Sequence, residues 1–165
     1  MAFASAIDDR YFEDYIEGDV HSFGSVEVVE DEIISFGKRF DPQRIHTDPD
    51  AARLTPFGGV IASGWHTAGL MMRLYVEHYL SHSASLVSPG LEELRWLKPV
   101  RPGDRLSLRV TILKTAASRS KPDRGAVTSQ VEVYNQENEL VMSLRVVNLL
   151  LRRAAARASD DVSCA

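Results

Sequence analysis

The stretch VIASGWHTAGLMMRLYVEH, residues 60–78, decides the fold of this 165-residue chain. It is the most apolar part of the sequence, and its apolar residues occupy most sides of a helix. A helix of that kind has to be buried by other elements that wrap around it. Polar residues interrupt the run at Ser63, His66, Thr67 and Arg73, which predicts a buried helix rather than a membrane span.

Two glycines in this helix, Gly64 and Gly69, lower its intrinsic helix propensity. Glycine is favoured where a backbone or a ligand comes too close for a side chain. We therefore expect a close approach at both positions.

The sequence after the helix is typical of antiparallel strands joined by turns. Residues 106–112 alternate apolar and polar side chains, which predicts a strand with one buried face. Further strands are predicted at residues 91–100, 127–133 and 140–150. Turns are predicted around Pro99, Pro102 and Gly103 and at residues 135–139, and a polar loop at residues 115–125.

The sequence before the helix predicts one strand and two short helices. Residues 25–30 form a β-branched run, and residues 31–40 form a helix that ends before Pro42. Asp48 followed by Pro49 is typical of a second helix start, and residues 55–59 form a turn.

These elements predict a single α+β domain. One antiparallel sheet wrapped around one long buried helix, with short helices before it, is the economical arrangement, and it is the hotdog fold. We expect residues 1–19 to form an N-terminal segment, 20–151 the domain and 152–165 a disordered tail. A sheet this small is expected to continue across a second copy, which predicts a homodimer.

Composition excludes several classes of protein. The chain is 44% hydrophobic and 25% charged, so it is neither disordered nor fibrous. Its net charge of −4 argues against a nucleic-acid or anionic-membrane binder. The single cysteine, Cys164, cannot form an intrachain disulfide, and the acidic first fifteen residues do not form a secretory signal. We expect a cytoplasmic protein.

The segment FDPQRIHTD, residues 40–48, holds the first candidate for chemistry. On one helix Asp41 and His46 would point about 140° apart, but Pro42 predicts a loop that brings them together. A carboxylate and an imidazole at one point can activate water or move a proton. The alternative is structural, because Asp before Pro is a common turn residue and His46 can brace the next helix.

The segment FGGVIASGW, residues 57–65, holds the second candidate. A glycine-containing turn that leads into a helix exposes backbone N–H groups at the positive end of the helix dipole. Such groups can stabilise negative charge that develops on a carbonyl oxygen. The alternative is that the glycines only permit tight packing.

Together with LKPVRPGD, residues 97–104, these two segments make the sequence resemble the MaoC-like dehydratase family, which includes the R-specific enoyl-CoA hydratases. The resemblance runs from about Val20 to Leu151 and implies a hotdog fold that is usually dimeric. It implies Asp41 and His46 as the catalytic pair and Gly64 as the residue whose N–H polarises a thioester carbonyl.

The resemblance also implies an activity. The substrate would be a trans-2-enoyl thioester of CoA or of acyl carrier protein, hydrated reversibly to a 3-hydroxyacyl thioester, with the acyl chain threaded along the long helix. No metal or redox cofactor is implied. Three residues depart from the family pattern: Gln43, Arg44 and Ser63. Gln43 can still hold the loop, and Arg44 can lower the pKa of Asp41 or meet a phosphate.

We expect Ser63 and Trp65 to contact substrate. The phosphates of CoA need a local basic patch, for which Lys98 and Arg101 beside the proline-rich turn are favoured over the remaining candidates: Arg95, Lys114, Arg119 and Lys121.

Other histidines have structural interpretations. His66 is expected to be a hydrogen-bonded core residue, although it can also line the pocket. Glu77, His78 and His82 have the spacing of a metal pair, but no third ligand is evident, so no metal is predicted.

Two other functions stay open. A hotdog thioesterase would use a carboxylate on or near the long helix, and residues 60–75 contain none. A non-catalytic acyl-CoA-binding subunit would not need both Asp41 and His46.

Overall fold

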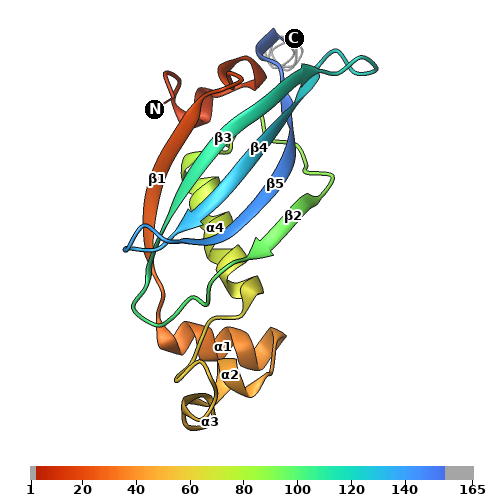
Figure 1. Ribbon diagram of the computed structural model, residues 1–165. Helices are drawn as coiled ribbons and strands as arrows, with labels where there is room; N and C mark the ends of the chain where they lie inside the picture. Colours follow the sequence, from red (N-terminus) through yellow and green to blue (C-terminus); the bar gives the residue numbers. More distant parts are fainter. Residues whose placement is uncertain (1–2, 155–165) are drawn as a thin grey trace.

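The computed structural model describes residues 3–154 and contains a five-stranded antiparallel sheet with one long helix (Figure 1). The short 3-10 helices are Ile7–Asp9 and Phe12–Asp14. The α-helices are α1 (Glu30–Phe40), α2 (Arg44–Thr47), α3 (Pro49–Arg53) and α4 (Gly64–His78). The strands are β1 (Val20–Glu27), β2 (Leu91–Trp96), β3 (Arg105–Ala117), β4 (Arg124–Tyr134) and β5 (Leu140–Leu151).

The sheet has the strand order β1-β3-β4-β5-β2, and every neighbouring pair is antiparallel. It curves around α4, while α1, α2 and α3 lie together beyond one end of the sheet (Figure 1). The predicted α+β hotdog architecture, with short helices before the long one, is confirmed.

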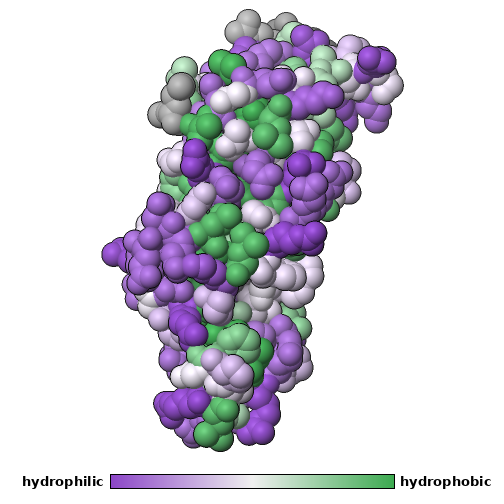
Figure 2. Space-filling model, in the orientation of Figure 1, coloured by the Kyte–Doolittle hydropathy of each residue, from purple (hydrophilic) through white to green (hydrophobic). Residues whose placement is uncertain are grey.

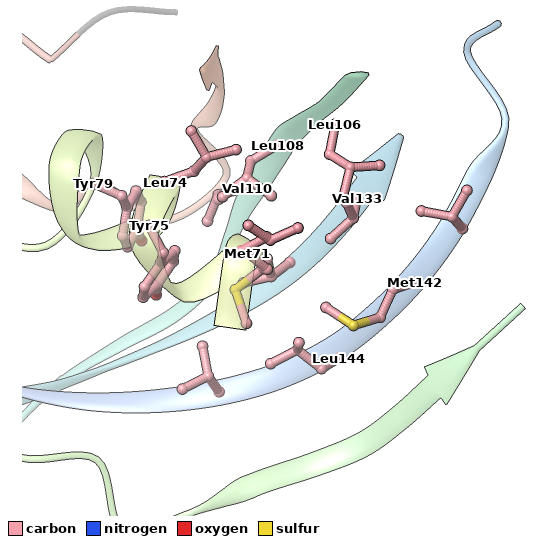
Figure 3. Packing of buried hydrophobic residues seen from close by; sticks show 14 of the residues in the cluster. Met71, Leu74, Tyr75, Tyr79, Leu106, Leu108, Val110, Val133, Met142 and Leu144 are labelled. Carbon is pink, nitrogen blue, oxygen red and sulfur yellow. The ribbon is translucent and has the colours of Figure 1, made fainter. Parts of the chain in front are cut away.

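The core lies between α4 and the inner face of the sheet. Burial alternates residue by residue along β4 and β5, as one-sided strands require. From the helix, Met71, Leu74 and Tyr75 meet strand residues such as Leu108 and Val133 (Figure 3). All five are almost fully buried.

Helix α4 begins at Gly64 and not at Val60. The Ser63 hydroxyl caps the helix by accepting a hydrogen bond from the Trp65 N–H at 3.3 Å. The apolar residues 60–62 instead lie in a non-helical connection, in which the N–H groups of Ile61 and Ala62 donate to the carbonyls of Ile45 and Val100. Because they are apolar without being helical, hydrophobicity alone predicted the wrong helix start.

The helix is also less enclosed than predicted. Trp65, Met72 and Val76 form an exposed face, with 59%, 41% and 41% of their surfaces accessible. A Cβ atom at Gly69 would meet nothing within 4 Å among the described residues, so no other part of the described chain makes the close approach predicted there. At Gly64 a close approach exists.

Two strand predictions and one loop prediction need corrected bounds. Strand β1 covers 20–27 rather than 25–30, because a bulge between Phe23 and Val26 disturbs the alternation that would have marked it. Strand β2 ends at Trp96 rather than at residue 100. The predicted polar loop at 115–125 is largely a hairpin, since β3 runs to Ala117 and β4 starts at Arg124.

The strand β2 forms one edge of the sheet, paired with β5. Its side chains are mostly exposed, including Leu91 and Trp96.

Figure 2 shows one face of the molecule, where hydrophilic residues separate several hydrophobic patches. Among the helices within residues 3–154, none is long and apolar enough to cross a membrane.

The two ends of the described chain are joined by ion pairs. Arg152 contacts Glu13 at 3.1 Å, and Arg153 contacts Asp14 at 2.7 Å. The tail predicted for 152–165 therefore begins with residues that are held against the N-terminal segment. Its remainder, 155–165, lies outside the described residues.

Candidate functional site

The end of α1 positions Asp41. Its backbone N–H donates to the Gly37 carbonyl at 2.9 Å, and Pro42 then prevents the helix from continuing. Both carboxylate oxygens of Asp41 accept hydrogen bonds, Oδ1 from Gln43 Nε2 at 2.8 Å and Oδ2 from the Ser63 hydroxyl at 2.7 Å. The carboxylate is therefore held in a fixed orientation from two sides.

The pKa of Asp41 lies below its ordinary value. The largest cause is the hydrogen bond from Gln43, followed by that from Ser63, and His46 contributes a smaller attraction. Arg44, predicted to lower this pKa, instead pairs with Asp48 at 3.1 Å. Gln43, which departs from the family pattern, thus still provides an amide donor to the Asp41 carboxylate.

His46 is buried on α2, a single helical turn. The sequence predicted a loop here because Pro42 ends the preceding helix. Pro42 disfavours helix only at the residue before it, so a new helical turn forms after it and the predicted loop is wrong. The imidazole Nδ1 lies 2.7 Å from the Ile61 carbonyl, which can only accept, so Nδ1 carries a proton. Nε2 then faces Asp41 Oδ2 at 3.4 Å.

This arrangement requires a hydrogen between the two groups. A neutral imidazole with its proton on Nδ1 has only a lone pair on Nε2, and the ionised carboxylate also offers only lone pairs. Their contact is favourable when Nε2 is protonated or when a water donates to both. The two groups are therefore placed to accept hydrogen bonds from one water.

Gly64 begins α4 next to this pair. As the first helical residue it has an N–H with no acceptor inside the helix, at the positive end of the dipole. A Cβ atom at Gly64 would overlap the Trp96 ring, and the indole N–H of Trp96 donates to the Gly64 carbonyl at 2.9 Å. Only glycine fits between α4 and this ring.

These groups line a cavity of about 490 Å³. Its buried end includes His46, Ile61, Ala62, Thr67 and Val100. Its open end carries exposed side chains, which are Phe57, Trp65, Trp96, Leu97, Lys98 and Pro99. The sequence-predicted residues Asp41, His46, Gly64, Ser63, Trp65 and Lys98 all line it.

Residues 12–135 of the chain match the family model described as MaoC like domain. The chain belongs to the MaoC-like dehydratase family. A solved MaoC-like dehydratase from Rhodospirillum rubrum is 39% identical, with a TM-score of 0.80 over 87% of this chain and 98% of that one. The resemblance seen in the sequence is therefore confirmed.

Two curated proteins are also similar in sequence to this chain. The uncharacterized protein YdeM of Bacillus subtilis is 29% identical over 140 residues, which cover 85% of this chain and 98% of YdeM. The 3-hydroxyacyl-thioester dehydratase Z of Mycobacterium tuberculosis is 32% identical over 94 residues, covering 56% of this chain and 62% of that protein.

The two basic residues predicted to meet phosphates in this MaoC-like chain have protein partners. Lys98 lies at the open end of the cavity, where its ammonium pairs with Glu139. Arg101 is not among the lining residues and donates to the Phe57 carbonyl at 2.8 Å. Arg101 therefore supports the cavity mouth through Phe57.

Ser63 and Trp96 have roles that the sequence did not indicate. Ser63, which was predicted to contact substrate, lines the cavity, and in addition its hydroxyl donates to Asp41 while its oxygen caps α4. Trp96 was predicted only as a strand residue, yet it forms the wall against Gly64. A separation of 32 residues between Trp96 and Gly64 leaves no local sequence signal for this contact.

The remaining histidines lie away from the cavity. His66 is buried and stacks on Phe36 with ring centroids 5.0 Å apart, but within the described chain its Nδ1 has no hydrogen-bond partner. It is a core residue as predicted, without the predicted hydrogen bond at Nδ1. Glu77 pairs with Arg73, and His82 pairs with Asp8, so these two do not share a site.

Proposed function

We propose that this chain adds water reversibly to a trans-2-enoyl thioester of CoA or of acyl carrier protein, giving a 3-hydroxyacyl thioester. The observation that carries the proposal is the Asp41–His46 pair, 3.4 Å apart at the buried side of a cavity. Membership of the MaoC-like dehydratase family supports the same reaction class.

In the proposed mechanism, one water is held between Asp41 Oδ2 and His46 Nε2. The hydrogen bond from Nδ1 to Ile61 leaves Nε2 of the neutral imidazole free to take a proton. As the water oxygen bonds to C3 of the substrate, Nε2 removes its proton, and ionised Asp41 stabilises the imidazolium that forms. The same proton then passes to C2, so that one water is added across the double bond.

Gly64 acts on the thioester oxygen of the substrate. Negative charge moves onto the thioester oxygen when the oxygen of water attacks C3. The N–H of Gly64, at the start of α4, would donate to that oxygen and lower the barrier. The reaction as proposed consumes only the thioester and water, and it uses no metal or redox cofactor.

We also propose that the working form is a homodimer. The free edge of β2 carries exposed Leu91 and Trp96, and an unpaired edge of this kind is stabilised by pairing with another strand. A second copy presents the same edge, so two sheets can continue into one.

Thioester hydrolysis is less well supported. The predicted requirement was a carboxylate on or near α4. Glu77 of α4 is paired with Arg73 and does not line the cavity. The carboxylate that does lie near α4, Asp41, faces His46 in the pair that hydration would use. A binding subunit without activity would have no use for a carboxylate and an imidazole that are placed to act on one water.

The test is the loss of enoyl absorbance when purified protein meets crotonyl-CoA. Asp41→Asn and His46→Gln should each lower kcat/KM by about 100-fold to 10,000-fold. Asp50→Asn and His82→Gln are matched controls, since they make the same chemical changes at exposed positions. A parallel assay for free thiol measures hydrolysis.

Hydration by the wild type and the controls, with loss in both site variants, is the expected result. Release of thiol without hydration would establish a thioesterase instead. Tight binding of CoA esters with no turnover would support the binding subunit.

A further inference from the structure

We infer that Trp96 is a positioning residue for the proposed reaction, because it holds Gly64 in the conformation that presents the Gly64 N–H to the thioester oxygen. This inference rests on the proposed function and assigns a role to a side chain that acts through another residue. The sequence indicated Trp96 only as part of a strand, yet its ring lies at the open end of the cavity.

Gly64 needs support from outside α4 to begin the helix. Glycine loses more conformational freedom on folding than any other residue, and the first turn of a helix has N–H groups without intrahelical partners. The Ser63 hydroxyl bonds to the N–H of Trp65, at 3.3 Å, rather than to that of Gly64. A residue with stronger helix propensity does not fit, because its Cβ atom would overlap the Trp96 ring. The conformation of Gly64 therefore depends on tertiary contacts.

Trp96 supplies two such contacts. Its indole N–H donates to the Gly64 carbonyl at 2.9 Å, and its ring fills the space beside the Gly64 Cα atom. Rotation about ψ of Gly64 would turn the carbonyl away from the indole N–H and break this bond. A shift of the backbone toward β2 would meet the ring. The indole thus restrains both the carbonyl and the Cα atom of the one residue in α4 that has the most freedom to move.

The conformation of Gly64 determines where its N–H points. That N–H belongs to the same planar peptide unit as the Ser63 carbonyl, and in a trans peptide the two groups point in opposite directions. The Ser63 carbonyl accepts from the Thr67 N–H at 3.0 Å, which closes the first turn of α4. Gly64 lies inside this turn, so the bond lasts only while Gly64 stays helical. The Gly64 N–H then points away from the helix, at the end where Ser63 contacts Asp41.

The sheet holds Trp96 from the side opposite to α4. Trp96 pairs with Met142 of β5. The next two N–H groups, those of Leu97 and Lys98, both donate to the Val141 carbonyl, at 2.8 and 3.3 Å. Figure 1 shows the end of β2 beside the start of α4. The indole is therefore a point of the sheet against which the first turn of α4 is placed.

Steady-state kinetics provide the first test. Trp96→Phe removes the indole N–H and keeps an aromatic ring beside Gly64. The kcat for crotonyl-CoA should fall by about 10-fold to 100-fold with little change in KM, because a misplaced N–H loses its effect on the transition state. Leu94→Ala is the matched control, since Leu94 is a partly buried residue of β2 that does not line the cavity. The control should be less stable but keep the wild-type kcat and KM.

Two kinetic results would overturn the inference and leave the proposed reaction intact. If Trp96 only stabilises the fold, Trp96→Phe and Leu94→Ala should lose kcat in proportion to the stability that each has lost. If the ring only contacts the substrate, Trp96→Phe should raise KM and keep the wild-type kcat. Denaturant unfolding of both variants supplies the stability that this comparison needs.

An infrared measurement separates the inference from the proposed reaction. Butyryl-CoA, isotope-labelled at the thioester carbonyl, cannot be hydrated, and its carbonyl stretching frequency falls when a hydrogen bond polarises the carbonyl. The bound ester should absorb at a lower frequency in the wild type and in Leu94→Ala than in Trp96→Phe. That result supports the role of Trp96 even when crotonyl-CoA is not turned over. Equal frequencies in the wild type and Trp96→Phe would overturn the inference even when the wild type hydrates crotonyl-CoA.

Discussion

The two ends of α4 both bury polar side chains, but they differ in whether those side chains are fully bonded. At the C-terminal end, the Tyr75 hydroxyl donates to Asn148 Oδ1 at 2.8 Å. The Tyr79 and Ser129 hydroxyls bond to each other at 2.7 Å. At the N-terminal end, Asp41 and His46 meet at 3.4 Å beside a cavity.

The same contrast appears in the charges. Burial raises the pKa of Tyr75 and of Tyr79, so both stay neutral. Hydrogen bonds instead lower the pKa of Asp41, so its carboxylate stays ionised. Saturated polar groups in a packed core stabilise the fold, whereas the pair at the other end presents acceptor atoms to a cavity. We expect substitutions at the two ends to affect stability and activity in opposite ways.

The largest expected effect is at Gly64. Proline suits the first position of a helix, and Ser63 before it already has the extended backbone that proline requires, but Gly64→Pro removes the N–H. Gly64→Ala is the control, since it adds a similar clash with Trp96 and keeps the N–H. The proline variant should turn over enoyl-CoA about 100-fold to 1,000-fold more slowly than the alanine variant. Equal rates would remove Gly64 from the mechanism.

A smaller effect, of the opposite kind, is expected at Tyr75. Tyr75→Phe leaves the buried Asn148 Oδ1 without this donor and should lower the free energy of unfolding by about 1–3 kcal/mol. Activity at a temperature where the variant is folded should stay at the wild-type level. Tyr134→Phe is the control, because it removes the hydroxyl of a tyrosine that is only half-buried. Denaturant unfolding measures the difference, and a Tyr75→Phe variant as stable as the control would contradict the comparison.

The smallest effect concerns His66, which lies near the site without facing the cavity. Burial lowers its pKa, while Glu32 opposes this weakly. As pH falls below about 6.5, the unfolded chain takes up a proton that folded His66 resists, so stability should decrease. Below the folded pKa the decrease stops. In His66→Phe, the denaturant midpoint of unfolding should change less between neutral and mildly acid pH than in the wild type. The same pH dependence in both proteins would contradict this account.

Much of the fold could be predicted because it depends on patterns along the chain. Alternation in residues 106–112 and 127–133 identifies strands with one buried face. The capping of α3 followed from Asp48 and Pro49, and Asp48 Oδ1 does accept from the Ala51 N–H at 3.0 Å. The start of α4 could not be found from hydrophobicity, because residues 60–62 are apolar but not helical.

Contacts distant in sequence explain what was missed at the site. Asp41 and His46 were identified because they share a short segment whose residue types suit acid–base chemistry. The contact of Trp96 with Gly64 and the ion pair of Lys98 with Glu139 depend on how β2 lies against α4 and β5. The backbone hydrogen bond from the Ala62 N–H to the Val100 carbonyl involves no particular side chain, so no residue type in the sequence predicts it.

The most direct test of the central claim is a double-variant cycle on the pair. The claim is that Asp41 and His46 act as one unit on one water. Crotonyl-CoA hydration is measured for Asp41→Asn, His46→Gln and the combined variant, with folding checked by circular dichroism. Because groups that act together are not additive, the combined variant should be about as slow as the slower single variant. A loss in the combined variant equal to the product of the two single losses would show that the residues act independently and would contradict the account.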